Sequence, residues 1–140
     1  FRFLVKPFEK EDLYEALDSV IKNLAKTAYI VVKDTVNQKN ITIPENEIIY
    51  AQADNIYAEV VTAQGIFLYS NKISLLEKEL NEAYFYRSNR SYIVNFNYII
   101  GYSKKEIEFS NGQKALISSS KFKDFKSKYL NYLKRKSIGE

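Results

Sequence analysis

Residues 85–95 read FYRSNRSYIVN, two short apolar runs on either side of a polar centre. The centre contains side chains that form hydrogen bonds readily, namely Arg87, Ser88, Asn89, Arg90 and Ser91. Arginine can donate two hydrogen bonds to guanine, asparagine can pair with adenine, and serine can donate to a phosphate oxygen. At a junction between two strands, such side chains would project together from one edge. The alternative is a polar loop in which Asn89 and Ser91 satisfy their own backbone at a hairpin turn.

Short strand-like runs separated by turn residues surround this stretch. Their apolar residues predict strands at residues 29–34, 41–43, 48–53, 56–63, 66–70, 107–110 and 114–118. The polar residues 36–40 predict a hairpin between the first two runs. Asn111-Gly112 predicts a type I′ hairpin between the last two, because both central residues of that turn need a positive φ. This part of the chain is therefore expected to be mainly β.

Two helices are expected to interrupt the strands. Ser74-Leu75-Leu76-Glu77 has the spacing of a capping box, in which a hydroxyl and a carboxylate bond each other's backbone donors, and it predicts a helix to about Ala83. A second helix is predicted from about Lys121 to Arg135. It carries an aromatic stripe made of Phe122, Phe125, Tyr129 and Tyr132. Most of the 12 tyrosines fall on such stripes or on strands, so we assign them to core packing rather than to stacking on bases.

The first 26 residues follow a different pattern. Residues 1–8, FRFLVKPF, form a short apolar run that ends at Lys6-Pro7, since proline cannot continue a strand ladder. Residues 9–26 place apolar side chains at helical spacing, with acids in the first turn and lysines in the last. One strand and one helix cannot bury that stripe alone, so we interpret residues 1–26 as the end of a larger α/β domain. The chain also opens on Phe1 rather than Met, and we expect it to be a piece of a longer protein.

The composition excludes several classes of chemistry. The 140-residue chain has no Cys and no His, which rules out thiolate or imidazole catalysis, Cys/His zinc sites and disulfides. Its 4 glycines form no phosphate-binding motif, and its acids show no paired spacing suited to acid–base catalysis. We therefore predict that the protein is not an enzyme, binds no metal and needs no cofactor. No apolar run reaches the ~18 residues of a membrane helix, so we expect a cytoplasmic protein without a membrane partner.

Charge is distributed unevenly along the chain. Residues 1–26 hold 5 basic and 5 acidic side chains, residues 27–83 hold 4 and 8, and residues 84–140 hold 12 and 4. The last segment therefore carries a net charge of +8, against +4 for the whole chain. Such a basic segment suits a surface that faces a polyanion. A solvated, lysine-rich helix at the C-terminus explains the same charge equally well.

From about Ala28 to Lys136 the chain resembles the LytTR family of DNA-binding domains. Its match to the most recognisable string of that family is Arg90-Ser91-Tyr92-Ile93-Val94-Asn95. The other matching segments, in the expected order, are Glu47-Ile48-Ile49-Tyr50, Asn55-Ile56-Tyr57, Lys72-Ile73-Ser74-Leu75, Asn97-Tyr98-Ile99, Asn111-Gly112 and Ser118-Ser119-Ser120-Lys121. The resemblance covers about four-fifths of the chain.

The first residues carry a second resemblance. Val5-Lys6-Pro7-Phe8 followed by an amphipathic helix is similar to the last strand and last helix of a response-regulator receiver domain. The two resemblances divide the chain into a receiver remnant, residues 1–26, and a LytTR-type DNA-binding domain, residues 27–140. The phosphorylated Asp of such a receiver would lie upstream of this chain.

The LytTR resemblance implies a mainly β fold of about ten strands in three small antiparallel sheets, with a short inserted helix and a C-terminal helix. It also implies that loops, rather than a recognition helix, enter the major groove of double-stranded DNA. The candidate DNA-binding residues are Asn55, Tyr57, Lys72, Arg87, Asn89, Arg90, Ser91, Ser119, Ser120, Lys121 and Lys123. Asn89 and Arg90 are the candidate base readers, and Ser91 is expected on phosphate.

The chain departs from the family pattern at two of these positions. Many members have His where this chain has Asn89, and often Arg where it has Ser120. Lys121 would replace that Arg only as a less specific point charge, so we expect a base preference that differs from that of relatives. Lys72 could reach a phosphate, although a solvated surface lysine explains it as well.

The resemblances imply the output domain of a two-component response regulator that controls transcription. The expected partners are promoter direct repeats in double-stranded DNA, the upstream receiver domain, a sensor histidine kinase and a second copy of the chain on DNA. The alternative is a protein-interaction module that docks an acidic partner on its basic face. The absence of Arg at Ser120 keeps that alternative open.

Overall fold

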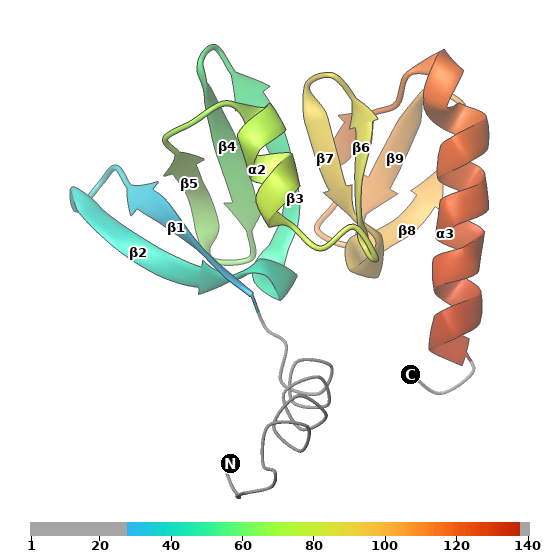
Figure 1. Cartoon of the computed structure of the whole chain (residues 1–140), viewed down its shortest axis with the longest axis horizontal. Coiled ribbons are helices and arrows are strands. Elements are labelled where there is room, and N and C mark those ends of the chain that lie inside the picture. Colours follow the sequence, from blue (N-terminus) through green and yellow to red (C-terminus); the bar gives the residue numbers. More distant parts are fainter. Residues whose placement is uncertain (1–27, 138–140) are drawn as a thin grey trace, which may run out of the picture.

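The computed structural model describes residues 28–137 of the chain. Within this range, ten strands alternate with two helices and three short 3-10 turns (Figure 1). The strands are β1 (Tyr29–Asp34), β2 (Lys39–Pro44), β3 (Ile48–Asp54), β4 (Tyr57–Thr62), β5 (Gly65–Tyr69), β6 (Phe85–Asn89), β7 (Tyr92–Asn95), β8 (Ile99–Tyr102), β9 (Glu106–Phe109) and β10 (Lys114–Leu116). The remaining elements are the helices α2 (Ile73–Glu79) and α3 (Phe122–Ser137) and the turns η1 (Glu45–Glu47), η2 (Phe96–Tyr98) and η3 (Ser119–Lys121).

The mainly β architecture confirms the expected fold class. The strand and helix predicted for residues 1–26 lie outside the described residues. Neither helix between residues 28 and 137 is long and apolar enough to cross a membrane.

The strands form two antiparallel sheets, not the three that the resemblance implied. The larger sheet has seven strands in the order β2-β1-β5-β4-β3-β7-β6, and the smaller has three in the order β10-β9-β8. Strand β3 pairs with β4 on one side and with β7 on the other. This double pairing joins what would otherwise be two separate sheets into one.

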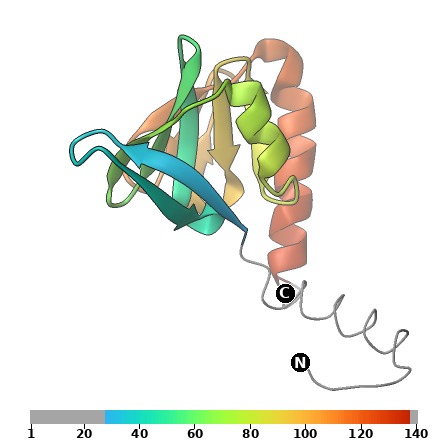
Figure 2. The same cartoon turned by 60° about the vertical axis from the view of Figure 1, so that its left-hand side comes forward.

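Two hydrophobic clusters lie on opposite faces of the larger sheet, because successive side chains of a strand point to opposite faces. Val60 belongs to the first cluster and Val61 to the second, and Ile93 and Val94 divide in the same way. The first cluster lies under α2, which contributes buried residues of its own. The second fills the space between the larger sheet, the smaller sheet and α3. The two helices therefore cover different parts of the fold (Figure 2).

The aromatic stripe predicted for the C-terminal helix is confirmed. Phe125 is fully buried, Tyr132 is 8% exposed, and Phe122 and Tyr129 are partly buried against the second cluster. The ring of Phe125 stacks on that of Tyr129, with centroids 5.7 Å apart. The helix thus packs through its aromatic face and leaves most of its lysines in solvent.

The predicted capping box at Ser74 is wrong. Helix α2 begins at Ile73 after the N-cap residue Lys72, and the structure gives this N-cap no side-chain hydrogen bond. Ile73 and Leu76 are buried, so their packing sets the start of the helix and leaves Ser74 inside the first turn. The helix also ends earlier than Ala83, at Glu79, because Leu80 takes an extended conformation and enters the first cluster.

The hairpin between β9 and β10 forms where Asn111-Gly112 predicts it, but its turn is not type I′. Gly112 has a φ of +88°, whereas Asn111 is not among the residues with a positive φ. The backbone N–H of Gly112 donates to the carbonyl of Phe109, and that of Phe109 donates to the carbonyl of Gln113, each at 2.9 Å. These bonds close a three-residue loop that ends in a left-handed glycine, the next most common hairpin after the two-residue turns.

Glu45 is a buried acid that the sequence pattern did not single out. It lies in η1, between β2 and β3, and is fully buried. One carboxylate oxygen accepts from the backbone N–H of Asn81 at 3.1 Å, and the other accepts from the hydroxyl of Tyr84 at 2.6 Å. Glu45 therefore ties η1 to the segment that connects α2 with β6.

Tyr69 makes the stability of the domain depend on pH in the alkaline range. Its ring is 5% exposed, and its hydroxyl donates a hydrogen bond to Glu79 of α2. Burial first, and then the bond to Glu79 and its charge, raise the pKa of Tyr69 from 10.0 to about 12. The folded state therefore holds this proton more tightly than the unfolded state does. The resulting stability is fully present below pH 10 and is lost as the pH rises toward 12.

In the wild type, the raised pKa of Tyr69 should lower the free energy of unfolding by on the order of 2 kcal/mol as the pH rises. We expect this part of the alkaline decrease to be absent in Tyr69→Phe. Urea unfolding at several pH values between 10 and 12 measures the slope, and that window follows from the raised pKa of Tyr69. Tyr29, which is 60% exposed, is the matched control, and Tyr29→Phe should keep the wild-type slope. An unaltered slope in Tyr69→Phe would contradict the prediction.

Candidate nucleic-acid interface

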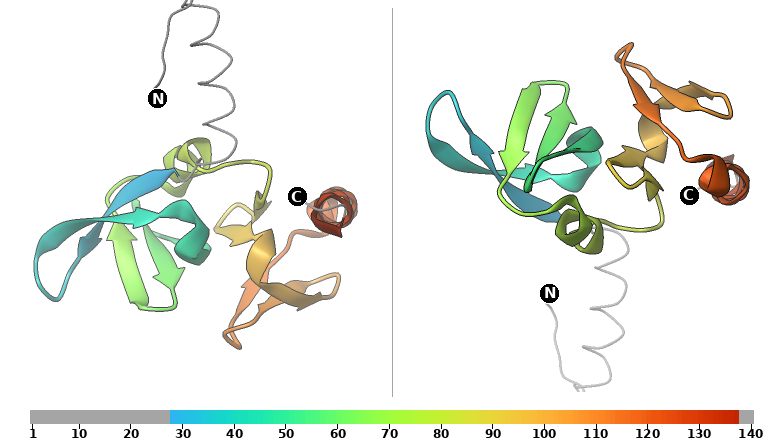
Figure 3. Two further views of the ribbon diagram at one scale, coloured as in Figure 1. Left: turned by 90° about the horizontal axis from the view of Figure 1, so that it is seen from below. Right: turned by 90° about the horizontal axis from the view of Figure 1, so that it is seen from above.

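Three turns lie side by side along one edge of the molecule, the upper edge in Figure 1. They are the β3–β4 turn (residues 54–57), the β6–β7 turn (residues 89–92) and the η3 turn (residues 118–121), and we call them the three edge turns. Figure 3 shows this edge from above in its right-hand view. The predicted contacts that lie in these turns are Asn55, Tyr57, Asn89, Arg90, Ser91, Ser119, Ser120 and Lys121. The fold thus gathers residues that are far apart in the sequence.

The β3–β4 turn presents side chains that point into solvent. Asn55 and Ile56 form a two-residue connection between the paired residues Asp54 and Tyr57. Asn55 has a φ of +64°, a left-handed conformation that asparagine tolerates better than most residues. Ile56 is 59% exposed and Tyr57 is 40% exposed. Ile56 was not among the contacts predicted from the sequence, although it lies between two of them and its apolar side chain suits contact with a thymine methyl group.

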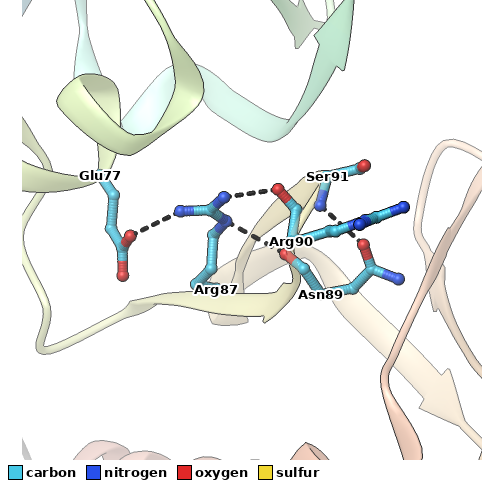
Figure 4. A network of polar contacts seen from close by, with 5 residues as sticks. All are labelled: Glu77, Arg87, Asn89, Arg90 and Ser91. Atoms are coloured by element: carbon cyan, nitrogen blue, oxygen red, sulfur yellow. Dashed lines mark hydrogen bonds and ion pairs between the residues drawn. The ribbon is translucent and has the colours of Figure 1, made fainter.

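The β6–β7 turn contains a β-bulge and the candidate base readers. Arg87 pairs with Ile93 whereas Asn89 pairs with Tyr92, so Ser88 is an extra residue in β6. The side-chain oxygen of Asn89 accepts a hydrogen bond from the backbone N–H of Ser91 at 2.7 Å. The alternative of a turn that satisfies its own backbone therefore holds for the side chain of Asn89, to which Ser91 contributes its backbone N–H (Figure 4).

Two groups of this turn remain directed outward. Arg90 is exposed at the tip of the turn, and Asn89 is half-buried, with its oxygen used within the turn. The amide nitrogen of Asn89 is the part of that side chain left to donate to a base.

The η3 turn is anchored to β6 by the bulged residue. The fully buried Ser88 donates its hydroxyl to the carbonyl of Leu116 at 2.8 Å, and its own carbonyl accepts from the N–H of Ser118 at 2.9 Å. The N–H of Lys121 closes the turn on the carbonyl of Ser118 at 2.9 Å. Ser119 and Ser120 are left exposed, free to meet a phosphate or a base.

Lys121 is held beside an aromatic ring. Its ammonium lies 5.7 Å from the ring centroid of Tyr86, a cation–π contact worth about 0.5–1 kcal/mol at an exposed site. The hydroxyl of Tyr86 donates to Asp124 at 2.8 Å. Burial, followed by this bond and the charge of Asp124, raises the pKa of Tyr86. The hydroxyl thus stays a donor that fixes the start of α3.

The edge turns are also linked to one another. The N–H of Ala53, just before the β3–β4 turn, donates to the carbonyl of Ser91 at 2.8 Å. Ser88 makes the corresponding link between the β6–β7 turn and the η3 turn. Their spacing is therefore set by backbone hydrogen bonds and by the side chain of Ser88.

Three of the predicted contacts lie outside the edge turns. Lys123 is exposed in the first turn of α3, and Lys72 is exposed at the start of α2. Arg87 points toward α2, where its guanidinium forms an ion pair with Glu77 at 2.8 Å. The structure thus leaves Lys72 and Lys123 open to a partner, but it engages Arg87 within the protein.

Further basic groups lie close to the η3 turn and were missed by the sequence analysis. Lys104 and Lys105, in the β8–β9 connection, are exposed. The carbonyl of Lys105 accepts from the N–H of Ile117 at 3.0 Å, directly before the η3 turn. The signal that would have indicated them is the Lys-Lys pair at the end of a strand.

The described residues form a mainly β domain with three polar turns along one edge. In a comparison with protein families, the model of the LytTr DNA-binding domain matches residues 38–130. The chain belongs to this family. It is a family of DNA-binding domains and not an enzyme family.

A solved structure has the same fold. The chain is similar to the LytTr DNA-binding domain of a Bacillus cereus protein described as a methyl-accepting/DNA response regulator. The two are 22% identical, the TM-score is 0.63, and the match covers 74% of this chain and 96% of the other. A comparison with curated proteins found no match.

Proposed function

We propose that residues 28–137 bind double-stranded DNA in a sequence-specific manner through the three edge turns. Membership of the LytTr DNA-binding family supports DNA as the partner. The observation that carries the proposal is that backbone hydrogen bonds hold three polar turns in one row. In this proposal, Asn89 and Arg90 contact base edges in the major groove.

Phosphate contacts are assigned to the polar and basic groups around the base readers. Hydroxyl and ammonium groups position a protein on the DNA backbone, and base contacts then provide the specificity. The proposed phosphate contacts are Lys72, Ser91, Ser119, Ser120, Lys121 and Lys123, and the proposed further groove contacts are Asn55 and Tyr57.

We also propose that the domain is the output module of a transcriptional response regulator. The similarity to a domain from a protein described as a response regulator supports this context. Residues 1–26 would then be the last strand and helix of the receiver domain, with a sensor histidine kinase acting upstream. Two copies of the protein would bind promoter direct repeats in the cytoplasm.

Selection from a randomised duplex pool, followed by fluorescence anisotropy at two salt concentrations, tests the DNA-binding proposal. We expect an enriched motif, repeated at about one helical turn if two copies bind adjacent half-sites. If six to eight phosphates are contacted, log K against log salt should have a slope of roughly −5 to −7.

The other outcomes separate the alternatives. Salt-sensitive binding without an enriched motif would contradict base reading and leave only a basic surface. No binding at low salt would overturn the proposal and favour a protein-interaction module that docks an acidic partner.

A further inference from the structure

Arg87 makes three hydrogen bonds within the protein through three different nitrogens (Figure 4). Nη1 donates to Oε1 of Glu77 in α2 at 2.8 Å. Nε donates to the backbone carbonyl of Asn89 at 3.1 Å, and Nη2 donates to that of Arg90. A single guanidinium therefore connects α2 to the backbone of the two candidate base readers.

The exposed fractions of the Arg87 and Glu77 side chains indicate which way the guanidinium of Arg87 faces. The side chain of Arg87 is 17% exposed, whereas that of Glu77 is 47% exposed. Two of the three acceptors are carbonyls of the turn itself, so the planar fork of the guanidinium lies against the inner side of the β6–β7 turn. Little of Arg87 is left for a phosphate or a base.

The register of β6 against β7 explains this orientation. Arg87 pairs with Ile93, a residue of the first cluster, and so points to the face of the sheet that α2 covers. The side chain of the next residue, Ser88, lies on the other face, where it reaches Leu116.

We infer that Arg87 and Glu77 are a positioning pair, which fixes the β6–β7 turn and thereby sets its base preference without contacting DNA. The role assigned to Arg87 differs from the direct contact predicted from the sequence. The inference rests on the proposed function of the edge turns.

The physical reason lies in the accuracy that base reading requires. Hydrogen bonds to base edges need side chains held within about 0.5 Å of the correct geometry. If Arg87 and Glu77 do not hold the β6–β7 turn, the turn must become ordered when it binds DNA. The conformational entropy lost in that ordering weakens binding. Contacts to phosphates tolerate the looser turn, because they depend on charge rather than on fine geometry. Loss of the pair should therefore reduce specificity more than general affinity.

Glu77→Ala provides the sharpest test, because charge and positioning predict opposite results. Loss of an acid near DNA should strengthen binding to every duplex if only charge matters. Loss of positioning should instead lower the ratio of the affinity for the selected duplex to that for a scrambled duplex of equal length. We expect this ratio to fall about three- to tenfold, which is the range of one ordinary net hydrogen bond at a partly exposed site.

Glu82→Ala is the matched control. Glu82 is also exposed, and within residues 28–137 the structure gives it no hydrogen bond or ion pair. The substitution Glu82→Ala should raise the affinity for the selected and the scrambled duplex equally and leave the ratio of the two affinities unchanged. Because Glu77 is half exposed, its replacement should leave the urea unfolding midpoint close to that of the wild type, which separates positioning from loss of fold.

Arg87→Lys tests the other partner while keeping the charge. A lysine cannot bond three acceptors with the geometry of a guanidinium, so we expect the specificity ratio to fall about tenfold with an unchanged salt slope. If Arg87 instead contacts a phosphate, Arg87→Lys keeps the ratio, and Arg87→Ala lowers the salt slope by about one on both duplexes. That result would overturn the inference.

Two further variants complete the test. Glu77→Gln keeps an acceptor for Arg87 and should restore part of the ratio lost in Glu77→Ala. In an Arg87→Ala background, Glu77→Ala should have little further effect on the ratio, because the two residues act as one unit. Additive effects of the two substitutions would contradict a shared role.

Failure of this inference can be told apart from failure of the proposed function. If the wild type enriches no motif from the randomised pool, the proposed base reading fails and the positioning role fails with it. If the wild type enriches a motif but Glu77→Ala behaves as Glu82→Ala does, the positioning role alone is overturned.

Discussion

Replacing Phe125 with alanine is expected to lower the free energy of unfolding by about 3–5 kcal/mol, the range for a large aromatic residue removed from a core. Phe125 is fully buried and lies at the centre of the second cluster. Its ring centroid is 5.8 Å from that of Tyr86, 5.4 Å from that of Tyr102 and 5.7 Å from that of Tyr129. These rings belong to β6, β8 and α3, so the cavity would open where both sheets meet the helix.

Urea denaturation of the wild type and Phe125→Ala measures the effect, with Leu130→Ala as the control on the same helix. Leu130 is 43% exposed, and its truncation should change the free energy of unfolding by roughly 0.5 kcal/mol or less. Similar losses for the two variants would show that the buried ring does not anchor α3. The same experiment bears on the site, since α3 begins directly after Lys121 and carries Lys123 in its first turn.

Seven of the ten strands in residues 28–137, and the C-terminal helix, could be predicted because their buried and exposed side chains recur with a local period. Along β1, Ile30 and Val32 are buried while Tyr29 and Val31 are exposed, which is the period of a half-buried strand. Along α3, the buried Phe125 and Tyr132 are seven residues apart, which returns them to one face of a helix. A local period is enough to identify such elements.

Apart from the turn type at Asn111-Gly112, the errors concern features that depend on contacts distant in the sequence. The start of α2 is set by the burial of Ile73, which a capping pattern at Ser74 does not contain. The two-sheet arrangement depends on the pairing of β3 with β7, about 40 residues further along the chain. Glu45 is buried because Asn81 and Tyr84 supply its hydrogen bonds, and neither partner is visible from the turn in which Glu45 lies.

The candidate site was predictable as a set of residues but not as a set of roles. Residue type alone indicates that Arg87 and Arg90 can both bind DNA. The pairing of Arg87 with Ile93 directs the first toward α2 and Glu77, and the turn leaves the second exposed. Only the register of β6 against β7 distinguishes the two arginines.

Arg90→Ala is expected to weaken binding to the selected duplex by about 5- to 150-fold, or 1–3 kcal/mol, and to relax the preference at one base position. The exposed guanidinium of Arg90 projects from the tip of the β6–β7 turn. Hydrogen bonds with Arg87, Asn89 and Ala53 hold the backbone of this turn. Its removal takes away a bidentate donor but leaves that turn clamped, because Arg87 bonds the carbonyl of residue 90 and not its side chain.

Repeating the duplex selection with Arg90→Ala identifies the base position that Arg90 reads. Lys123→Ala is the matched control, since it removes one exposed positive charge outside the edge turns. We expect it to reduce the salt slope by about one and to weaken binding equally on selected and scrambled duplexes. If Arg90→Ala does the same, its guanidinium is only a phosphate contact, and base reading must then come from Asn89 and the β3–β4 turn. A relaxed position in Arg90→Ala alone would place the arginine in the groove and the lysine on the backbone.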